Sequence, residues 1–375
     1  MRTKQKMMRL CLCILLCGAM LCQTTSAEGT PFHSPMVVKS KQTGADELIN
    51  ATGKVIFSAP DGVLNVTPMW DNVYCIEKMD DNGLSTYAIC DDRHLLTDFA
   101  FSHVDTASKN TLPILASDLQ YQYGYIDLNG QWVILPQWVY AAPFSEGLAY
   151  VESESGIAFL DQLGSAKLEF SFAQMLFGEP FSEGLALVRF VDQSWGYIDI
   201  NGNITIKNNY IEASSFHDDY ALVKDESGYF FIDHSGIAMA ENRWKYAQDF
   251  QFGFAIVAPE NGQYGVIDTQ GNVIFPFEAN HIIDITAEQL CWISTKNASK
   301  FGLYNLQTKA FLTPECYDIP FPEGFVENET GFIVKRDGLY GFLSKEGEVL
   351  IPCVYEFLYF GDDGSVLKAE SKDQL

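Results

Sequence analysis

The sequence predicts an all-β protein made of tandem, three-stranded antiparallel repeats, arranged as a propeller or as an open β-superhelix. Three observations lead to this fold class: a short motif returns along the chain, its apolar runs have the length of strands, and turn residues separate them. The runs are rich in Val, Ile, Tyr and Phe, the residues that favour strands. Helical periodicity does not extend over a useful length.

The motif is clearest in residues 123–136, 195–206 and 264–276. Each copy reads aromatic-Gly, two apolar residues and Asp, then two variable residues and Gly, then a second apolar run. Weaker copies fill the gaps. The residues that open the turns stand at positions 50, 90, 127, 161, 199, 233, 268, 305 and 344, so the intervals run from 34 to 40 residues. About nine units are therefore expected.

The Asp-x-x-Gly segment suits a tight hairpin turn. The Asp carboxylate can accept backbone N–H groups of the turn, and Gly adopts the left-handed conformation that strains other residues. The structural turn residues predicted in this way are Asp127, Gly130, Asp161, Gly164, Asp199, Gly202, Asp233, Gly236, Asp268, Gly271 and Gly347. A proline then closes the following strand, where a missing N–H does least harm; these prolines are Pro136, Pro276, Pro314 and Pro352.

A second element, Phe-Ser-Glu-Gly-Leu-Ala, occupies residues 144–149 and 181–186, and residues 216–223 and 250–257 keep its frame. One unit of about 36 residues buries too little surface to stand alone, so neighbours must stack. The repeated aromatics are then the core between units. The alternative is a row of sugar-stacking aromatics, against which the uneven spacing of the tryptophans argues.

With both elements in view, the sequence resembles the WG-repeat family, whose members are mainly bacterial chains of tandem β-rich repeats. The resemblance is strong over residues 121–352 and weak over 47–120, although only Trp195-Gly196 keeps the literal Trp-Gly pair. Ala158 and Phe230 replace the glycine, so backbone packing should differ in those units. The family implies a repeat scaffold and offers no catalytic residues to transfer.

The first residues have the three-part pattern of a secretory signal peptide: four basic residues, an apolar run and small residues at 25–27. We therefore expect a signal peptide at 1–27, a linker at 28–46, divergent β-repeats at 47–120 and a WG-type array at 121–371. The protein would be secreted or otherwise extracytoplasmic. A lipid anchor at Cys22 and a short uncleaved membrane anchor are the alternatives.

The chain is strongly acidic, with a formal net charge of −25. Loss of residues 1–27 removes four basic and no acidic residues, which leaves −29. Such a surface repels phosphate backbones and anionic lipid headgroups, so nucleic acid is an improbable partner. No membrane span is expected after signal cleavage.

Cys75 and Cys90 flank a predicted hairpin with Asn82-Gly83 at its tip. Counting outward from a two-residue turn places the two cysteines opposite each other, which makes a disulfide our hypothesis. The alternative is two buried thiols that act as small apolar residues. The remaining cysteines of the mature chain, Cys291, Cys316 and Cys353, are scattered and form no disulfide framework or zinc motif.

No catalytic, cofactor-binding or metal-binding residues are predicted. Acidic pairs at 80–81, 91–92, 218–219 and 362–363 read as solvated turns rather than calcium ligands. His217-Asp218-Asp219 could be an acid–base pair, but it lies in a variable linker. Paired carboxylates for glycoside hydrolysis depend on spatial separation, which a sequence does not give.

These observations favour a non-catalytic extracytoplasmic scaffold that binds a protein or a cell-envelope glycan through the variable segments between its strands. Two alternatives stay open: a glycan-active hydrolase on the same scaffold and a purely structural envelope protein. The hydrolase would need a pocket with converging carboxylates or histidines of shifted pKa.

Overall fold

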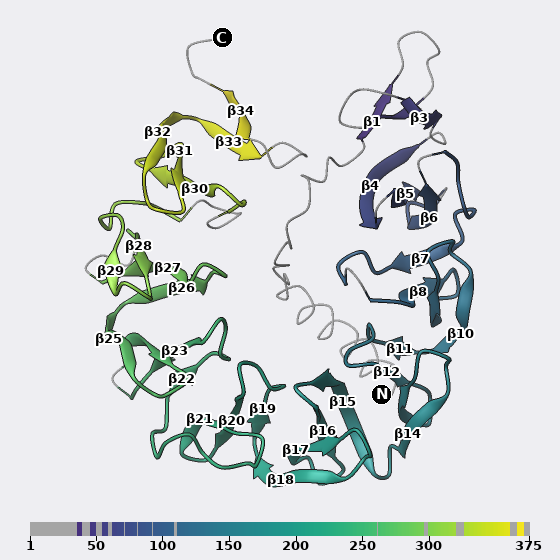
Figure 1. The fold of residues 1–375 in the computed structure, drawn as a ribbon, viewed down its shortest axis with the longest axis horizontal. Coiled ribbons are helices and arrows are strands. Elements are labelled where there is room, and N and C mark those ends of the chain that lie inside the picture. The colour runs from purple at the N-terminus through teal and green to yellow at the C-terminus, as the bar shows by residue number, and fades with distance from the viewer. Residues whose placement is uncertain are drawn as a thin grey trace. The chain divides into compact units, whose positions relative to one another are not determined.

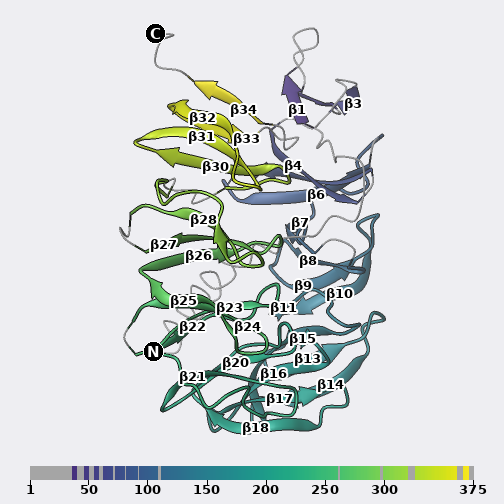
Figure 2. The same cartoon turned by 60° about the vertical axis from the view of Figure 1, so that its left-hand side comes forward.

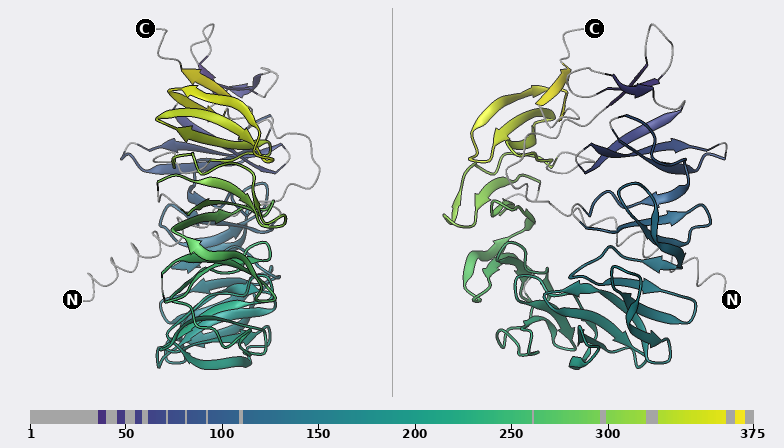
Figure 3. Two further views of the ribbon diagram at one scale, coloured as in Figure 1. Left: turned by 90° about the vertical axis from the view of Figure 1, so that its left-hand side faces the viewer. Right: turned by 45° about the vertical axis from the view of Figure 1, so that its right-hand side comes forward.

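A computed structural model describes residues 36–39, 46–49, 55–58, 62–70, 72–80, 82–91, 93–108, 111–260, 262–295, 299–319, 326–360 and 366–370. It confirms the all-β prediction: small antiparallel sheets follow one another in chain order (Figures 1 and 2). Figure 3 shows the same succession of sheets from two further sides. The expected signal peptide and most of the linker lie outside the described residues.

Four of the sheets have four strands, one strand more than predicted. The extra strand is the first of each sheet, and in the β11–β14 sheet it precedes the Phe-Ser-Glu-Gly turn. Their strands are β11 (Tyr140–Ala141), β12 (Ala149–Glu152), β13 (Gly156–Leu160) and β14 (Ala166–Ser171); β15 (Met175–Ser182), β16 (Leu185–Phe190), β17 (Trp195–Asp199) and β18 (Ile204–Tyr210); β22 (Tyr246–Ala247), β23 (Phe254–Ala258), β24 (Tyr264–Asp268) and β25 (Val273–Ala279); and β26 (His281–Ile285), β27 (Leu290–Ser294), β28 (Gly302–Asn305) and β29 (Ala310–Phe311).

The other sheets differ in strand number. Those of three strands are β1 (Met36–Lys39), β2 (Asp46–Ile49) and β3 (Val55–Ser58); β19 (Glu212–Ala213), β20 (Ala221–Asp225) and β21 (Gly228–Ile232); and β30 (Gly331–Arg336), β31 (Leu339–Ser344) and β32 (Val349–Tyr355). A seven-stranded sheet contains β4 (Val63–Trp70), β5 (Val73–Met79), β6 (Ser85–Asp91), β7 (Phe101–Val104), β8 (Ile114–Asp118), β9 (Tyr123–Ile126) and β10 (Trp132–Trp138). The pair β33 (Phe357–Phe360) and β34 (Val366–Glu370) comes last.

The motif turns share one hydrogen-bond pattern. In the copy that begins at Asp127, the backbone N–H of Gly130 donates to the Asp127 carbonyl at 3.0 Å. The Asp127 carboxylate accepts the N–H groups of Asn129 and Gln131, each at 2.8 Å. Gly130 has a φ of 71°, which explains the residue type. The same bonds form at Asp161, Asp199, Asp233 and Asp268, and at Ser344 the hydroxyl replaces the carboxylate.

Three of the four prolines do not close their strands, which corrects the prediction, whereas Pro314 follows β29 as expected. Pro136, Pro276 and Pro352 lie inside β10, β25 and β32, where the register shifts by a bulge. The bulge brings backbone against the motif glycine: a Cβ on Gly124 would stand 2.8 Å from the nitrogen of Pro136. The glycine is thus needed to admit the bulged strand.

The two copies that lack this glycine also lack a bulged strand opposite it. Ala158 pairs with Glu169 in a stretch of regular register, so β14 does not bulge there. Where Phe230 takes the position, the sheet stops at β21, and the Arg243 guanidinium lies 3.7 Å from the centre of the Phe230 ring.

The core lies between consecutive sheets. One cluster joins Tyr150 and Phe159 of the β11–β14 sheet to Phe181 and Val188 of the next, and the rings of Phe159 and Phe181 are 5.0 Å apart. A second cluster joins that sheet to β19–β21 in the same way. Most of the repeated aromatic side chains therefore pack between units.

Among the described residues, the structure has no helix of the length and apolar character that a membrane crossing demands. The arrangement of the sheets as a propeller or as an open superhelix stays a prediction.

Candidate functional site

A group of hydrogen-bonded polar side chains lies around the segment from Ser214 to Asp219, which connects β19 to β20. Here the Phe-Ser-Glu-Gly frame has become Phe-His-Asp-Asp, preceded by two serines. Glu179 and Glu183 come from the preceding sheet, and Asp249 follows β22 of the next sheet. Three consecutive sheets thus contribute to one polar region.

Two carboxyl groups are held by the two serines. The hydroxyl of Ser215 donates to Glu179 at 2.6 Å, and that of Ser214 donates to Asp249 at 2.5 Å. Burial raises the pKa of both carboxyls, and the Asp249 charge raises that of Glu179 further. His217 and the serine hydroxyls oppose these shifts. Paired carboxyls with raised pKa are what the sequence could not reveal, because the two residues are far apart in the chain.

The structure does not form the acid–base pair considered for His217 and its neighbours. The carboxylate of Asp218 instead accepts the backbone N–H of Gly253, in the following unit, at 2.9 Å. Asp219 turns its backbone N–H to the carboxylate of Glu183, in the preceding unit, at 3.0 Å. Asp218 and Asp219 therefore form hydrogen bonds with neighbouring units.

Glu183, Asp219 and His234 bring one ligand atom each within 4.8 Å of one another. His234 Nε2 lies 3.4 Å from Glu183, and its ring stacks on Phe216 at 4.3 Å. A carboxylate, a second carboxylate and an imidazole are a donor set that a divalent metal ion such as zinc accepts. The sequence does not indicate this group, because its three residues come from different turns.

The Phe-Ser-Glu-Gly turns form the same kind of link between earlier units. Glu146 accepts the backbone N–H of Gly184 at 2.9 Å. The hydroxyl of Ser145 donates to the carbonyl of Phe181, and that of Ser182 to the carbonyl of Phe216, each at 2.6 Å. Ser and Glu of the motif thus bind each unit to the next.

Cys75 and Cys90 correct the disulfide hypothesis. Both are free thiols, and β5 pairs with β6 so that Cys75 faces Ile89 while Cys90 faces Tyr74. The predicted register is wrong by one residue, because Asp80 closes a longer turn whose Asp80 N–H donates to the Leu84 carbonyl. A one-residue slip sends the two side chains to opposite faces of the sheet, where they join different core clusters.

The predicted acidic pairs are turn residues where the structure describes them. The carboxylate of Asp80 accepts the N–H groups of Asn82 and Leu84, and that of Asp91 accepts those of Arg93 and His94. These bonds hold the pKa of both carboxyls below the usual value. Asp81, Asp92, Asp362 and Asp363 lie outside the described residues.

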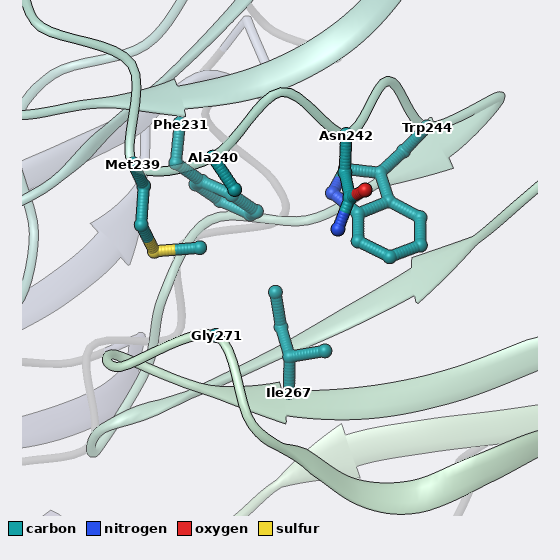
Figure 4. Close-up of a pocket in the computed structure, with 7 residues that line it drawn as sticks. All are labelled: Phe231, Met239, Ala240, Asn242, Trp244, Ile267 and Gly271. Carbon is teal, nitrogen blue, oxygen red and sulfur yellow. The ribbon is translucent and has the colours of Figure 1, made fainter.

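A small pocket lies in the next unit, between the β21 turn and β24 (Figure 4). Its volume is about 20 Å³, and its lining includes Phe231, Met239, Trp244 and Ile267. That space admits about one water molecule, so the pocket is too small for an organic ligand.

The comparisons with known proteins bear on the repeat. The model of the WG containing repeat matches residues 123–155, 195–229, 264–284 and 340–364. These four segments are similar to the WG containing repeat. The first match begins at β9 and the second at β17, and each ends in the following sheet. Each of these two matched segments therefore spans parts of two sheets.

Solved structures give a partial likeness. BamB from Moraxella catarrhalis is 14% identical, over 68% of this chain and 92% of that chain, with a TM-score of 0.35. Kluyveromyces lactis Hsv2 is 9% identical, over 69% and 95%, with a TM-score of 0.38. A eukaryotic initiation factor is 11% identical, over 87% and 96%, with a TM-score of 0.49. A comparison with curated proteins gives no match.

Proposed function

We propose that this WG-repeat chain is a non-catalytic scaffold that acts outside the cytoplasm and binds a protein or a cell-envelope glycan. One observation carries the proposal: the carboxylates and hydroxyls of the polar region form hydrogen bonds between units. Ser214 with Asp249, Ser215 with Glu179, and Asp218 with Gly253 are such bonds. These side chains serve the assembly of the array.

Binding would fall to the segments that vary between units, since a rigid frame with variable connections is the usual way in which repeat proteins present a surface. A location outside the cytoplasm is supported by the basic and apolar residues that precede position 28. The strong negative charge keeps nucleic acid an unfavourable partner.

The binding function is tested by immobilising the full chain and passing over it envelope proteins and purified envelope glycans separately. Saturable binding of one of them is the expected result. Absence of binding above that of an unrelated acidic β-protein would overturn the proposal. The location is tested by the N-terminus of the protein recovered from the medium or envelope, which is expected at residue 28.

A glycan hydrolase is the second candidate, favoured by the raised pKa of Glu179 and Asp249. A carboxyl with a raised pKa is a candidate for the general acid of such a reaction. Release of reducing ends from an envelope glycan, abolished by Glu179→Gln, would establish this candidate in place of the scaffold.

A further inference from the structure

The turn after β8 holds a tyrosine where the Asp-x-x-Gly turns hold glycine; two further turns of this kind hold a glutamine there, Gln193 and Gln289. The N–H of Tyr121 donates to the Asp118 carbonyl at 3.0 Å, and the Asp118 carboxylate accepts the N–H groups of Gln120 and Gln122 at 2.9 Å. This is the pattern of the Asp127 turn, with Tyr121 at the position of Gly130. Its φ is 60°, which is unusual for a bulky residue. Strain of this kind gathers at functional positions.

Packing within the chain does not account for the tyrosine. Its side chain is 58% exposed, and it makes no ring contact or side-chain hydrogen bond with the described residues. Phe252, which has a φ of 55°, differs because its ring packs against a buried core cluster. At Tyr121 an aromatic ring is held in solvent at a conformational cost.

A groove of about 380 Å³ lies beside this ring. One wall is the β5–β6 hairpin, with Lys78, Met79 and Leu84; the other is the turn that carries Leu119 and Tyr121. The groove opens where β6 and β7 separate, since these strands share only the pair Tyr87 and Phe101. Its volume is that of a small-ligand site.

We propose that this groove binds a neutral carbohydrate, with the Tyr121 ring stacked on the apolar face of a sugar. The proposal rests on the proposed binding function and names the ligand class for one site. Asp80 supplies an acceptor and Lys78 a donor at the groove, and sugar hydroxyls both donate and accept. Lys78 is held in place, because its ammonium lies 4.1 Å from the centre of the Phe99 ring.

Two other ligand classes fit less well. The net charge of −25 disfavours an anionic ligand. An extended peptide needs a long row of unpaired backbone groups along a sheet edge. Each of β5 to β8 has a neighbouring strand on both sides, and at the groove only the short stretch of β6 before Tyr87 lies beyond the single pair with β7. A ring-shaped ligand with one apolar face and a polar rim remains.

The test is calorimetric titration of the full chain with short neutral gluco-, manno-, galacto- and N-acetylglucosamine oligosaccharides. At least one is expected to bind saturably. Tyr121→Gly should weaken that binding on the order of tenfold while leaving the melting temperature unchanged or higher, because glycine relieves the strain. Tyr121→Phe should keep the affinity, and Leu163→Ala, in the equivalent turn of another unit, should not affect it.

Equal affinity of Tyr121→Gly and the unaltered chain would overturn the groove site while leaving glycan binding by the scaffold intact. Failure of every oligosaccharide to bind would also overturn it, and capture of an envelope protein would then keep the scaffold function. Leu84→Ser, on the opposite wall, provides a second variant: it should weaken the same binding, and an unchanged affinity counts against the groove.

Discussion

The carboxylate of Glu146 accepts the backbone N–H of Gly184, which lies 38 residues further along the chain, at 2.9 Å. Glu183 repeats this contact with Asp219 in the next unit at 3.0 Å. A residue that looks like a solvated turn residue in the sequence therefore joins successive units. This contact constrains the length of the repeat, because the carboxylate of one unit must reach a backbone N–H in the equivalent turn of the next.

Glu146→Ala should lower the stability of the array by about 1 kcal/mol, since the N–H of Gly184 loses a charged acceptor. The measurement is the free energy of unfolding in urea. Glu154→Ala is the matched control, because Glu154 is an exposed acidic residue of the same sheet without such a bond in the described structure. Equal effects of the two substitutions would show that the contact adds nothing.

Gly130→Ala should destabilise more than Gly147→Ala. Both glycines have positive φ, 71° and 83°, so an alanine is strained by about 1 kcal/mol at either position. Only at Gly130 does the new Cβ meet a side chain, 2.2 Å from Thr97 Cγ2, whereas nothing lies within 4 Å at Gly147. We expect the clash to add about 1–3 kcal/mol.

Urea unfolding of the two variants side by side separates backbone strain from packing. A similar loss in both would mean that Thr97 moves aside at no cost, and that the turn glycine serves its backbone conformation alone.

The repeat, the strands and the burial of the aromatics could be predicted because each follows from local pattern. An Asp and a Gly at the spacing of Asp127 and Gly130 specify a turn in each copy. The alternation of such turns with apolar runs then implies the sheets. The position of Pro136 inside β10 could not be predicted. The bulge that admits it depends on close backbone contact with Gly124 of the neighbouring strand β9, which the local sequence does not show.

The contacts between units lay beyond sequence reasoning for a similar reason. Ser214 and Asp249 are 35 residues apart, and their contact depends on how two sheets stack. The register of Cys75 and Cys90 was missed on a smaller scale, since one added turn residue changes every pair of a hairpin.

Glu179→Gln should stabilise the protein at neutral and alkaline pH. The pKa of Glu179 is raised by burial in the folded chain, so folding favours the protonated form. Its contribution to stability is full below the ordinary carboxyl pKa of about 4.3 and is lost as pH rises through the folded value. Glutamine is neutral throughout and still accepts the Ser215 hydroxyl.

The measurement is the melting temperature of both proteins from pH 4 to pH 8. The variant should match the unaltered chain at the acidic end and exceed it by a few degrees at the alkaline end. Glu154→Gln, at an exposed position, should show no such divergence. A variant that is less stable at every pH would mean that the ionised Glu179 contributes favourable interactions.

Cys75 and Cys90 should both be alkylated once the chain is unfolded without reductant, because they are free and face different residues across the strands. In the folded protein neither should react, since burial raises the pKa of each thiol to about 12 and leaves almost no thiolate at pH 8. Cys316, which is only half-buried, is the internal control and should react first. Peptide mass spectrometry after iodoacetamide treatment distinguishes the three sites, and a Cys75–Cys90 linked peptide would restore the register that the structure excludes.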